Sequence, residues 1–330
     1  MNRGVALSLA ALISSALGLA GCGRYADFTL PVLTGGDARW SFTFESRPEP
    51  VLSPGDGWDS HDALAPAVID GRSMLYSGFD GHTWRTGVAT ADGGIWHKQG
   101  VLLEPDARGW EGDYIAANGS AMPVGGQIWY WYVAGPRGFP RIGLWRRSAS
   151  PRKEPRPVVE AGPYQSWDER GVADPYVVRI GGWFYMYYLG QDRARRQRLG
   201  VARSEDGLRW EKLRSNPILE LGASGAFDEN GLGEPAVWEY RGFYWMLYTG
   251  RDIGENRRLG LARSADGVHW KKLPAVFSGS EAWDSKVLCD PSVIVEGSEI
   301  RVWFGGGDVA RPDENIHGRI GMAILRPVPP

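Results

Sequence analysis

Short apolar segments alternate with glycine turns along most of the chain. Residues 185–188 are Tyr-Met-Tyr-Tyr and residues 244–248 are Tyr-Trp-Met-Leu-Tyr, and each follows a shorter apolar segment and a glycine turn. Segments of this length, rich in aromatic residues and bounded by glycine, are typical of β-strands. The pattern ends in Ser-x-Asp-Gly-x-x-Trp at 204–210 and 264–270. Asp-Gly between two strands favours a tight hairpin because that turn requires positive φ, so we expect four strands in each unit.

These units form an internal repeat of five copies. Each copy opens with an aromatic residue and an acid, and four of the five reach a second pair, usually an acid and a proline, six residues after that acid. The copies start about 50 to 60 residues apart, a period typical of repeat architectures. The second pairs are Ala65-Pro66, Asn118-Gly119, Asp174-Pro175, Glu234-Pro235 and Asp290-Pro291. Four strands in five copies predict an all-β fold, a five-bladed β-propeller with four antiparallel strands per blade.

The two ends of the repeat are incomplete in a complementary way. The Asp-Ala-Arg-Trp sequence at 37–40 resembles Gly-Leu-Arg-Trp at 207–210, near the end of a unit, so segment 38–46 looks like a fourth strand without a blade. The last unit nearly runs out of chain after its third strand at 320–325. We expect the N-terminal strand to complete the last blade, since this removes two open sheet edges. The propeller domain would then span 37–330.

The first residues have the pattern of a bacterial export signal. Arg3 precedes an apolar run at 5–19, which is too short to span a membrane. Residues 19–22, Leu-Ala-Gly-Cys, resemble the bacterial lipobox, in which the cysteine carries lipid and becomes the first residue of the mature chain. We therefore expect a lipoprotein signal peptide at 1–21 and lipidation of Cys22.

Composition and the residues after the lipobox indicate where in the cell the protein lies and which classes of partner are excluded. We expect 22–36 to be a tether and the protein to be lipid-anchored in the bacterial cell envelope. Gly23 is not the Asp that commonly retains lipoproteins at the inner membrane, which favours the outer membrane in a Gram-negative host. The formal net charge of -2 argues against a nucleic-acid partner. Cys22 and Cys289 are the only cysteines, so a lipidated monomer, the expected state, has no disulfide.

The repeated unit resembles the arabinanase, levansucrase and invertase superfamily of five-bladed propellers. The aromatic-acid pair, the acid-proline pair, the aromatic strand and the Gly-x-Ala-x-Ser-x-Asp-Gly-x-x-Trp ending carry this resemblance, over roughly 37–327. The superfamily includes glycoside hydrolase families 43, 32, 68 and 130, so the resemblance implies a carbohydrate substrate or ligand. It also implies that carboxylates at the start of the innermost strands surround the central channel.

The family 43 pattern implies a role for three of these inner positions. It has an Asp base in the first blade, an Asp that tunes a pKa in the third, and a Glu general acid in the fourth. Asp174 and Glu234 match the last two positions. Two close carboxyl groups resist joint ionisation, so Asp174 would raise the pKa of Glu234 and keep it protonated. We expect both side chains to face one solvent-filled pocket.

The first blade departs from this pattern. Its matching residue is Ala65, which can neither accept a proton nor attack carbon, although glycoside hydrolysis needs a second carboxylate. Asp62, with His61 beside it, is the nearest substitute, and Asp290 borders the first blade if the ring closes. We expect Asp62 to be the better placed, roughly 6.5–9.5 Å from Glu234 in an inverting enzyme and near 5 Å in a retaining one.

Further polar and aromatic residues are candidate substrate contacts. The rings suit sugar stacking, although packing between blades is an equal alternative. No cofactor or metal is expected, and His317 marks the one place where the family 43 resemblance suggests a channel ion. The candidate contacts are Asn118, Asp290, His61, Arg170, Tyr176 and Trp84.

Three functions fit this sequence. The leading hypothesis is an exported glycoside hydrolase of the family 43 type. The second is a carbohydrate-binding propeller that has lost catalysis, which Ala65 supports. The third is a phosphorylase like those of family 130, in which phosphate replaces water and its base. That chemistry needs no base at the position of Ala65. It requires several basic residues in the channel, where the sequence places only Arg170.

Overall fold

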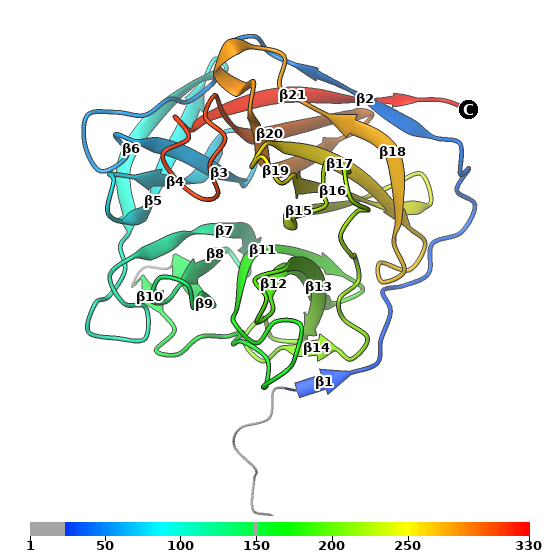
Figure 1. The fold of residues 1–330 in the computed structure, drawn as a ribbon, viewed down its shortest axis with the longest axis horizontal. Coiled ribbons are helices and arrows are strands. Elements are labelled where there is room, and N and C mark those ends of the chain that lie inside the picture. Colours follow the sequence, from blue (N-terminus) through cyan, green and yellow to red (C-terminus); the bar gives the residue numbers. More distant parts are fainter. Residues whose placement is uncertain (1–23, 148–150) are drawn as a thin grey trace, which may run out of the picture.

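The computed structural model describes residues 24–147 and 151–330, and it has the predicted five-bladed form. Five blades of four strands stand around a central axis, with β3, β7, β11, β15 and β19 innermost (Figure 1). Blade 1 consists of β3 (Asp62–Val68), β4 (Ser73–Phe79), β5 (Trp84–Asp92) and β6 (Ile95–Leu103). Blade 2 consists of β7 (Ile115–Val124), β8 (Gln127–Ala134), β9 (Arg141–Arg147) and β10 (Arg152–Lys153).

The remaining blades follow in chain order. Blade 3 consists of β11 (Gly171–Ile180), β12 (Trp183–Gln191), β13 (Gln197–Ser204) and β14 (Glu211–Leu213). Blade 4 consists of β15 (Gly231–Tyr240), β16 (Phe243–Arg251), β17 (Arg257–Ser264) and β18 (Lys271–Phe277). A short 3-10 helix, η1 (Ala282–Asp284), leads into β19 (Val287–Glu296), β20 (Glu299–Gly307) and β21 (Arg319–Val328) of blade 5.

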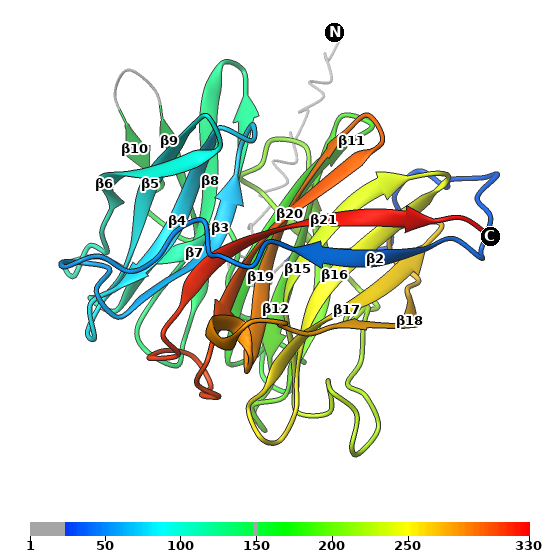
Figure 2. The same cartoon turned by 90° about the horizontal axis from the view of Figure 1, so that it is seen from above.

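The N-terminal strand completes blade 5, as predicted. β2 (Ser41–Ser46) runs antiparallel to β21, with Phe44 opposite Leu325, and Figure 2 shows the two strands side by side. Phe42 and Phe44 pack into the apolar core of blades 4 and 5. The pairing supplies hydrogen-bond partners to β21, whose outer edge would otherwise be open. The ring is therefore closed by strands from opposite ends of the chain.

Each innermost strand carries a β-bulge at the second pair of the repeat. The pairing of β11 with β12 shifts register between Ala173 and Tyr176, and the other four blades have the same shift. The bulged residue has positive φ in every blade, from 44° to 50°. Such a conformation costs about 1–3 kcal/mol in a residue other than glycine. These inner-ring residues are Ala65, Asn118, Asp174, Glu234 and Asp290.

The acid that opens each copy of the repeat is buried inside its own blade. Asp168 accepts a hydrogen bond from the Lys212 ammonium at 2.5 Å, and the Asp59–Lys98 and Asp228–Lys272 pairs are equally short. Glu111 and Lys153 form the same pair in blade 2 at 2.6 Å. In each case the lysine lies on the outermost strand, so this ion pair joins that strand to the loop before the innermost one.

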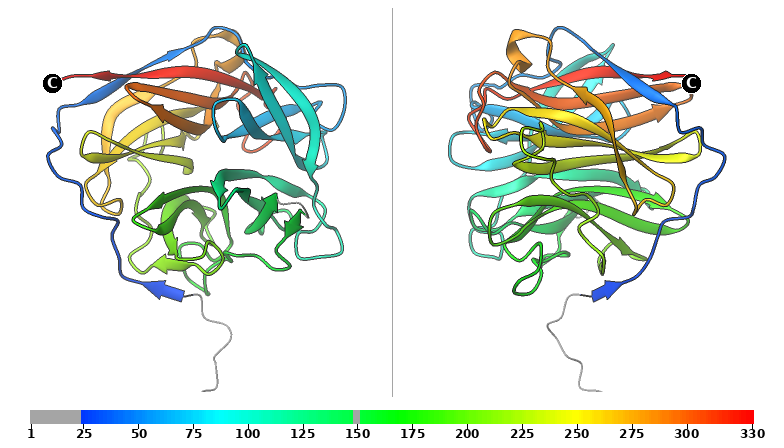
Figure 3. Two further views of the ribbon diagram at one scale, coloured as in Figure 1. Left: turned by 180° about the vertical axis from the view of Figure 1, so that it is seen from behind. Right: turned by 45° about the vertical axis from the view of Figure 1, so that its right-hand side comes forward.

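The segment 24–36, which we name the strap, is packed against the propeller. Its β1 (Arg24–Ala26) pairs in parallel with β14 of blade 3. Leu30 is 1% exposed, and its N–H donates to the Asp266 carbonyl at 2.8 Å, at the Asp-Gly turn of blade 4. From there the chain runs along the rim to β2 (Figure 3). The segment expected to be a tether is therefore packed on the propeller from Arg24 onward, with the Leu30 side chain in an apolar site between blades.

Gly267 explains why the strap docks at this turn. Its φ is 71°, which the Asp-Gly hairpin requires, and a Cβ atom there would lie 2.7 Å from Leu30 Cδ2. The glycine thus serves the turn and leaves room for the strap. Cys22 and the expected signal peptide lie outside the described residues. Within the described residues no helix is long and apolar enough to cross a membrane.

Candidate active site

The inner-ring residues stand between two cavities on the propeller axis. The larger, of about 470 Å³, is lined by residues that precede the inner ring along each strand and by the adjoining loops. The smaller, of about 180 Å³, is lined by residues that follow the ring. Asn118, Asp174, Glu234 and Asp290 border both. The expectation that Asp174 and Glu234 share one pocket is confirmed, and Asp290 joins them there.

Burial shapes the acidity of the three ring carboxyl groups. It raises the pKa of Glu234 to about 7, with the charge of Asp290 adding to the effect. Burial also raises the pKa of Asp174 well above its usual range, assisted by the charges of Glu234 and Asp290. The pKa of Asp290 is raised by burial as well. Three carboxyl groups in one site favour protonated forms, which the sequence predicted for Glu234, although Asp290 and not Asp174 supplies the charge that raises its pKa.

A buried cation opposes this tendency. Arg257, 8% exposed, lines the larger cavity, and its charge acts to lower the pKa of Asp174, Glu234 and Asp290. Its guanidinium donates a hydrogen bond to the Arg311 carbonyl at 2.8 Å. Asp290 also accepts a hydrogen bond from the thiol of Cys289 at 3.1 Å. The ring therefore has a supporting layer that holds its carboxyl groups in place.

Two buried polar atoms of the ring lack a partner. Asn118 Oδ1 and Glu234 Oε2 form no hydrogen bond with any described residue. Almost all buried polar atoms in folded proteins are hydrogen-bonded. Both atoms belong to residues that border the cavities, so hydroxyl groups of a ligand, or water, are their natural partners.

Asp62 lies elsewhere, and the expectation that it is the better placed base is wrong. Its side chain is fully buried and borders neither cavity. It accepts backbone N–H groups from Asn315 at 2.6 Å, Ile316 at 3.1 Å and Gly318 at 2.7 Å. These three amides satisfy the carboxylate outside both cavities. The adjacent His61 also borders neither cavity, and its Nδ1 lies 2.7 Å from Asn315 Oδ1.

The other candidate contacts fall on both sides of the ring. Arg170 lines the larger cavity, stacked at 4.6 Å over Phe139. Trp84 borders the same cavity but is only 3% exposed and stacks on Phe79, so its ring packs within blade 1 and is no exposed platform. Tyr176 borders the smaller cavity instead. The structure thus does not bring Arg170, Trp84 and Tyr176 into one subsite.

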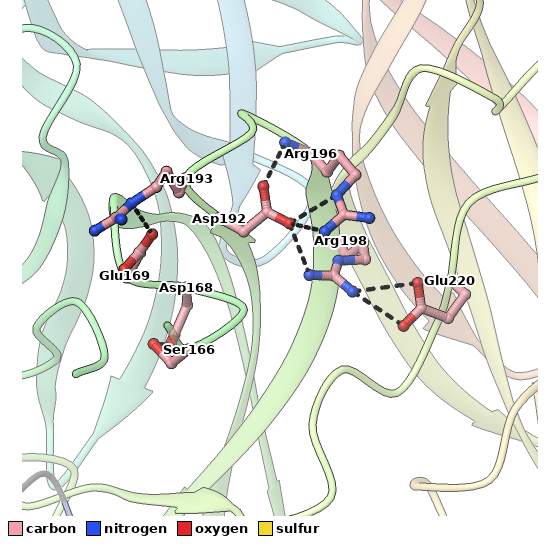
Figure 4. A network of polar contacts seen from close by, with 8 residues as sticks. All are labelled: Ser166, Asp168, Glu169, Asp192, Arg193, Arg196, Arg198 and Glu220. Atoms are coloured by element: carbon pink, nitrogen blue, oxygen red, sulfur yellow. Dashed lines mark hydrogen bonds and ion pairs between the residues drawn. The ribbon is translucent and has the colours of Figure 1, made fainter. Parts of the chain in front are cut away.

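The arginine-rich loop between β12 and β13 is largely neutralised. Figure 4 shows that Asp192 pairs with Arg196 at 2.8 Å and with Arg198 at 3.2 Å, while Arg193 pairs with Glu169 at 3.0 Å. Arg195 differs, because it lines the larger cavity. The larger cavity is in fact rich in arginine, which the sequence did not reveal. The lining arginines are Arg137, Arg170, Arg195, Arg251 and Arg257.

The loop between β20 and β21 contributes residues that sequence reasoning missed. Pro312 and Asp313 line the larger cavity. Glu314 accepts a hydrogen bond from the Tyr114 hydroxyl at 2.8 Å and pairs with Arg137. The repeat gave no signal for this loop, since the other blades have no equivalent of its length.

The described residues hold no group of three or more His, Cys, Asp or Glu side chains arranged to bind a metal ion. His317, the suggested marker of a channel ion, borders neither cavity, because its Nδ1 lies 2.7 Å from Asp308 Oδ1 at the surface.

A family comparison matches most of this ring. Residues 76–283 match the family model described as the glycosyl hydrolases family 32 N-terminal domain. The chain belongs to this family. The match includes the inner-ring residues Asn118, Asp174 and Glu234. A family 43 membership is not shown, whereas the five-bladed fold and the link to glycoside-cleaving enzymes are.

Solved structures resemble this family 32 domain in fold. A structure titled "Glycoside hydrolase" superposes with a TM-score of 0.69 at 17% identity, covering 85% of this chain and 92% of that one. A second structure comes from a study of the GH130 family of mannoside phosphorylases, which contains glycoside hydrolases that target β-1,2 mannosidic linkages in Candida mannan. It has a TM-score of 0.66 at 18% identity and covers 91% of this chain and 96% of that one. The Bombyx mori GH32 β-fructofuranosidase gives 0.60 at 18%, covering 84% and 61%.

Two curated sequence relatives match part of this chain. An uncharacterized protein of Mycobacterium tuberculosis is 30% identical over 159 residues, which are 45% of this chain and 52% of the relative. The 1,2-β-oligomannan phosphorylase of Thermoanaerobacter sp. is 24% identical over 135 residues, 38% of this chain and 45% of the relative. The chain thus spans about half the length of the curated relatives it matches.

Proposed function

We propose that the protein hydrolyses glycosidic bonds, with Glu234 as the general acid. The observation that carries this proposal is the site of Glu234, half-buried on the larger cavity in one ring with Asp174 and Asp290, with its pKa raised to about 7. A carboxyl group of that acidity is protonated near neutral pH and can still release its proton to a leaving oxygen. Membership of a glycosyl hydrolase family supports the same reading.

The neighbouring ring residues have supporting roles in this proposal. Asp174 binds substrate hydroxyl groups, as the family 43 resemblance implies, whereas the charge that raises the pKa of Glu234 comes from Asp290 and not from Asp174 as expected. Asp290 and Asn118 offer further oxygen atoms to the sugar from the same cavity. Arg257 limits how far the three pKa values rise, so that Glu234 can still ionise during turnover.

The test is turnover of a defined glycoside panel. We suggest para-nitrophenyl β-mannopyranoside, α-arabinofuranoside and β-xylopyranoside, with sucrose and β-1,2-mannobiose added because of the structural relatives. Glu234→Gln should lower kcat by about 10²–10⁴-fold while calorimetry still detects binding. Glu239→Gln, an exposed site on the same strand β15, is the matched control. Undiminished turnover by Glu234→Gln would reject the assigned acid.

Phosphorolysis is a second candidate, favoured by one specific observation. The five arginines that line the larger cavity supply the basic surroundings that an attacking phosphate needs, and one relative is a 1,2-β-oligomannan phosphorylase. In that case turnover of β-1,2-mannobiose should require inorganic phosphate and release a sugar phosphate. Turnover in phosphate-free buffer with free sugar as the product supports hydrolysis instead.

The carbohydrate-binding propeller without activity stays the alternative from a different class. Ala65 at the usual position of the base supports it. It predicts calorimetric binding to a glycan of the panel with no turnover by the wild-type protein. Absence of binding to a wider set of plant and bacterial glycans would count against the enzyme and the binding protein alike.

We also propose that the propeller is held in the bacterial cell envelope by lipid on Cys22, on the strength of the Leu-Ala-Gly-Cys motif. The wild-type protein, expressed in a bacterium fed with labelled palmitate, should incorporate the label. Cys22→Ser should lose it, whereas label retained on that variant would exclude the anchor. Fractionation of the labelled cells would then identify the membrane.

A further inference from the structure

The loop of residues 308–318, between β20 and β21, forms one wall of the larger cavity. It brings Pro312 and Asp313 to the lining of that cavity. Two contacts fix the loop to other blades: the Tyr114 hydroxyl donates to Glu314 at 2.8 Å, and Arg257 donates to the Arg311 carbonyl at 2.8 Å. Residues on both sides of Asp313 are therefore fixed, and its place beside the cavity follows from them.

Blade 1 anchors the other end of this loop. The buried carboxylate of Asp62 accepts three backbone N–H groups, from Asn315, Ile316 and Gly318, at 2.6 to 3.1 Å. Hydrogen bonds to a charged acceptor are roughly twice as strong as neutral ones. Asp62 thus holds the loop only a few residues from Asp313. The blade that carries Ala65 in its ring position therefore acts on the cavity through a loop of blade 5.

Hydrolysis needs a carboxylate in its ionised form to activate water, and the ring is a poor source of one. Burial raises the pKa of Asp174, Glu234 and Asp290 alike, which favours their protonated forms. A carboxylate that keeps its hydration also keeps the charge that a base needs. Asp313 is exposed to solvent and has no hydrogen bond or ion pair within the described residues.

Asp313 lines the same cavity as the ring carboxyl groups and lies close enough to act on their charges. Its charge contributes to the raised pKa of Asp174, after burial, Glu234 and Asp290. It also acts on Arg257, the cation of the ring. Asp313 is the fourth carboxylate on the lining of the larger cavity.

We propose that Asp313 is the general base of the hydrolysis and that Asp62 is the residue that positions it. The inference rests on the proposed function. Asp313 takes a proton from water as the water oxygen bonds to the anomeric carbon. Glu234 gives its proton to the glycosidic oxygen as the carbon–oxygen bond breaks. The products are a free sugar and an alcohol, and proton exchange with solvent restores both carboxyl groups.

The roles of base and acid predict different rescue patterns in the full-length protein. On the panel glycoside that the wild type cleaves fastest, Asp313→Ala should lower kcat by about 10²–10⁴-fold. A dinitrophenyl leaving group needs no acid, so it should restore turnover to Glu234→Gln but not to Asp313→Ala. Sodium azide, which can attack carbon without a base, should restore turnover to Asp313→Ala and form a glycosyl azide.

Two variants separate the base from its support. Asp308→Asn changes an exposed carboxylate of the same loop, paired with His317 outside the cavities, and should keep wild-type kcat. Asp62→Asn weakens the anchor, so it should lower kcat less than Asp313→Ala does. The acidic limb of the pH–rate profile should persist in Asp62→Asn and vanish in Asp313→Ala.

The outcomes distinguish this inference from the proposed function. If wild-type hydrolysis is observed and Asp313→Ala keeps kcat within threefold of it, Asp313 is not the base although hydrolysis stands. If turnover requires phosphate and Asp313→Ala retains it, phosphorolysis replaces both statements, because phosphate needs no base. If the wild type cleaves nothing, both the proposed hydrolysis and the assignment of Asp313 as its base are rejected.

Discussion

Glu234 meets two opposing demands within a single side chain. Burial beside Asp290 keeps it protonated, which a general acid requires, and the same burial makes its ionisation costly to the fold. Its ordinary pKa of 4.5 applies in the unfolded chain, and about 7 applies in the folded one. As the pH rises between these values the unfolded chain releases its proton first, so the folded state loses stability across this window.

Glu234→Gln should therefore stabilise the protein in a pH-dependent way. The variant cannot ionise, so its free energy of unfolding should match that of the wild type near pH 4 and exceed it by about 3 kcal/mol at pH 8. Urea unfolding at both pH values measures the difference, with Glu239→Gln as the exposed control. A constant difference between the two pH values would mean that Glu234 does not titrate in this range.

Arg257→Gln should move the pH dependence of activity. The arginine opposes the raised pKa of Glu234, so its loss should raise that pKa further and keep the acid protonated to higher pH. We expect the alkaline limb of kcat/KM to shift upward by about one pH unit. Arg258→Gln, a partly exposed neighbour at 3.8 Å from Asp252, should leave the limb in place.

The sequence could identify ring residues only where the repeat marks them. Asp174 and Glu234 occupy an aligned position, so the comparison of blades found them. Asp62 was inferred because it is close to Ala65 in sequence. Such closeness cannot reveal that the Asp62 carboxylate accepts hydrogen bonds from three backbone amides. Arg257 had a signal that went unused: it stands at the start of the third strand of blade 4, where blade 3 has Gln197.

At the scale of elements, the buried pair of an acid and a lysine is the repeated joint of the propeller. It occurs in blades 1 to 4, where the outermost strand supplies the lysine. In blade 5 the outermost strand is β2, and Ser46 lies opposite Ala323 where Lys272 lies opposite Ala262 in blade 4. Asp284 accordingly has one buried oxygen without a partner among the described residues.

Lys212→Met tests the strength of this joint. Asp168 is fully buried and would be left as an unpaired charge, so we expect the free energy of unfolding to fall by about 3–5 kcal/mol. Chemical unfolding measures the change, and Lys271→Met, at an exposed site on β18, is the control. The double variant Lys212→Met with Asp168→Leu should recover much of the loss, since no buried charge remains. A loss equal to that of Lys271→Met would make the pair dispensable.

The elements themselves were predictable because five copies report the same pattern. Strand order, the turns with positive φ and the pairing of β2 with blade 5 all follow from aligned positions. The 308–318 loop occurs once, so no other copy indicates its path, which depends on contacts with Asp62, Tyr114 and Arg257. Such contacts between distant parts of the chain exist only in the assembled ring.

At the scale of the whole molecule, the strap joins three blades. It pairs with β14 of blade 3, inserts Leu30 at the turn of blade 4 and continues into β2 of blade 5. Tyr244 of blade 4 donates a hydrogen bond to the Pro31 carbonyl at 2.8 Å. If Cys22 is lipidated, the anchor is attached to the rim of the propeller with almost no free chain between them.

Leu30→Ala should loosen the strap without opening the ring. Removing a fully buried leucine side chain costs about 2–5 kcal/mol. Because the strap lies at the rim, that cost should appear as local release, measured as faster proteolytic cleavage within 24–36 while the melting temperature changes little. Val32→Ala, at a position that is 64% exposed, should cleave at the wild-type rate. Equal cleavage rates in the two variants would show that Leu30 does not secure the segment.

The pairing of β2 with β21 has a consequence for folding during synthesis of the chain. Glu45 and Arg326, an ion pair across these strands, are 281 positions apart in the chain. At roughly 5–20 residues per second, synthesis leaves β2 without its partner for about 14 to 56 seconds. Throughout that time the ring is open, and its edge strands can pair with other chains. Closure of the ring must therefore wait until the last strand of the chain has been made.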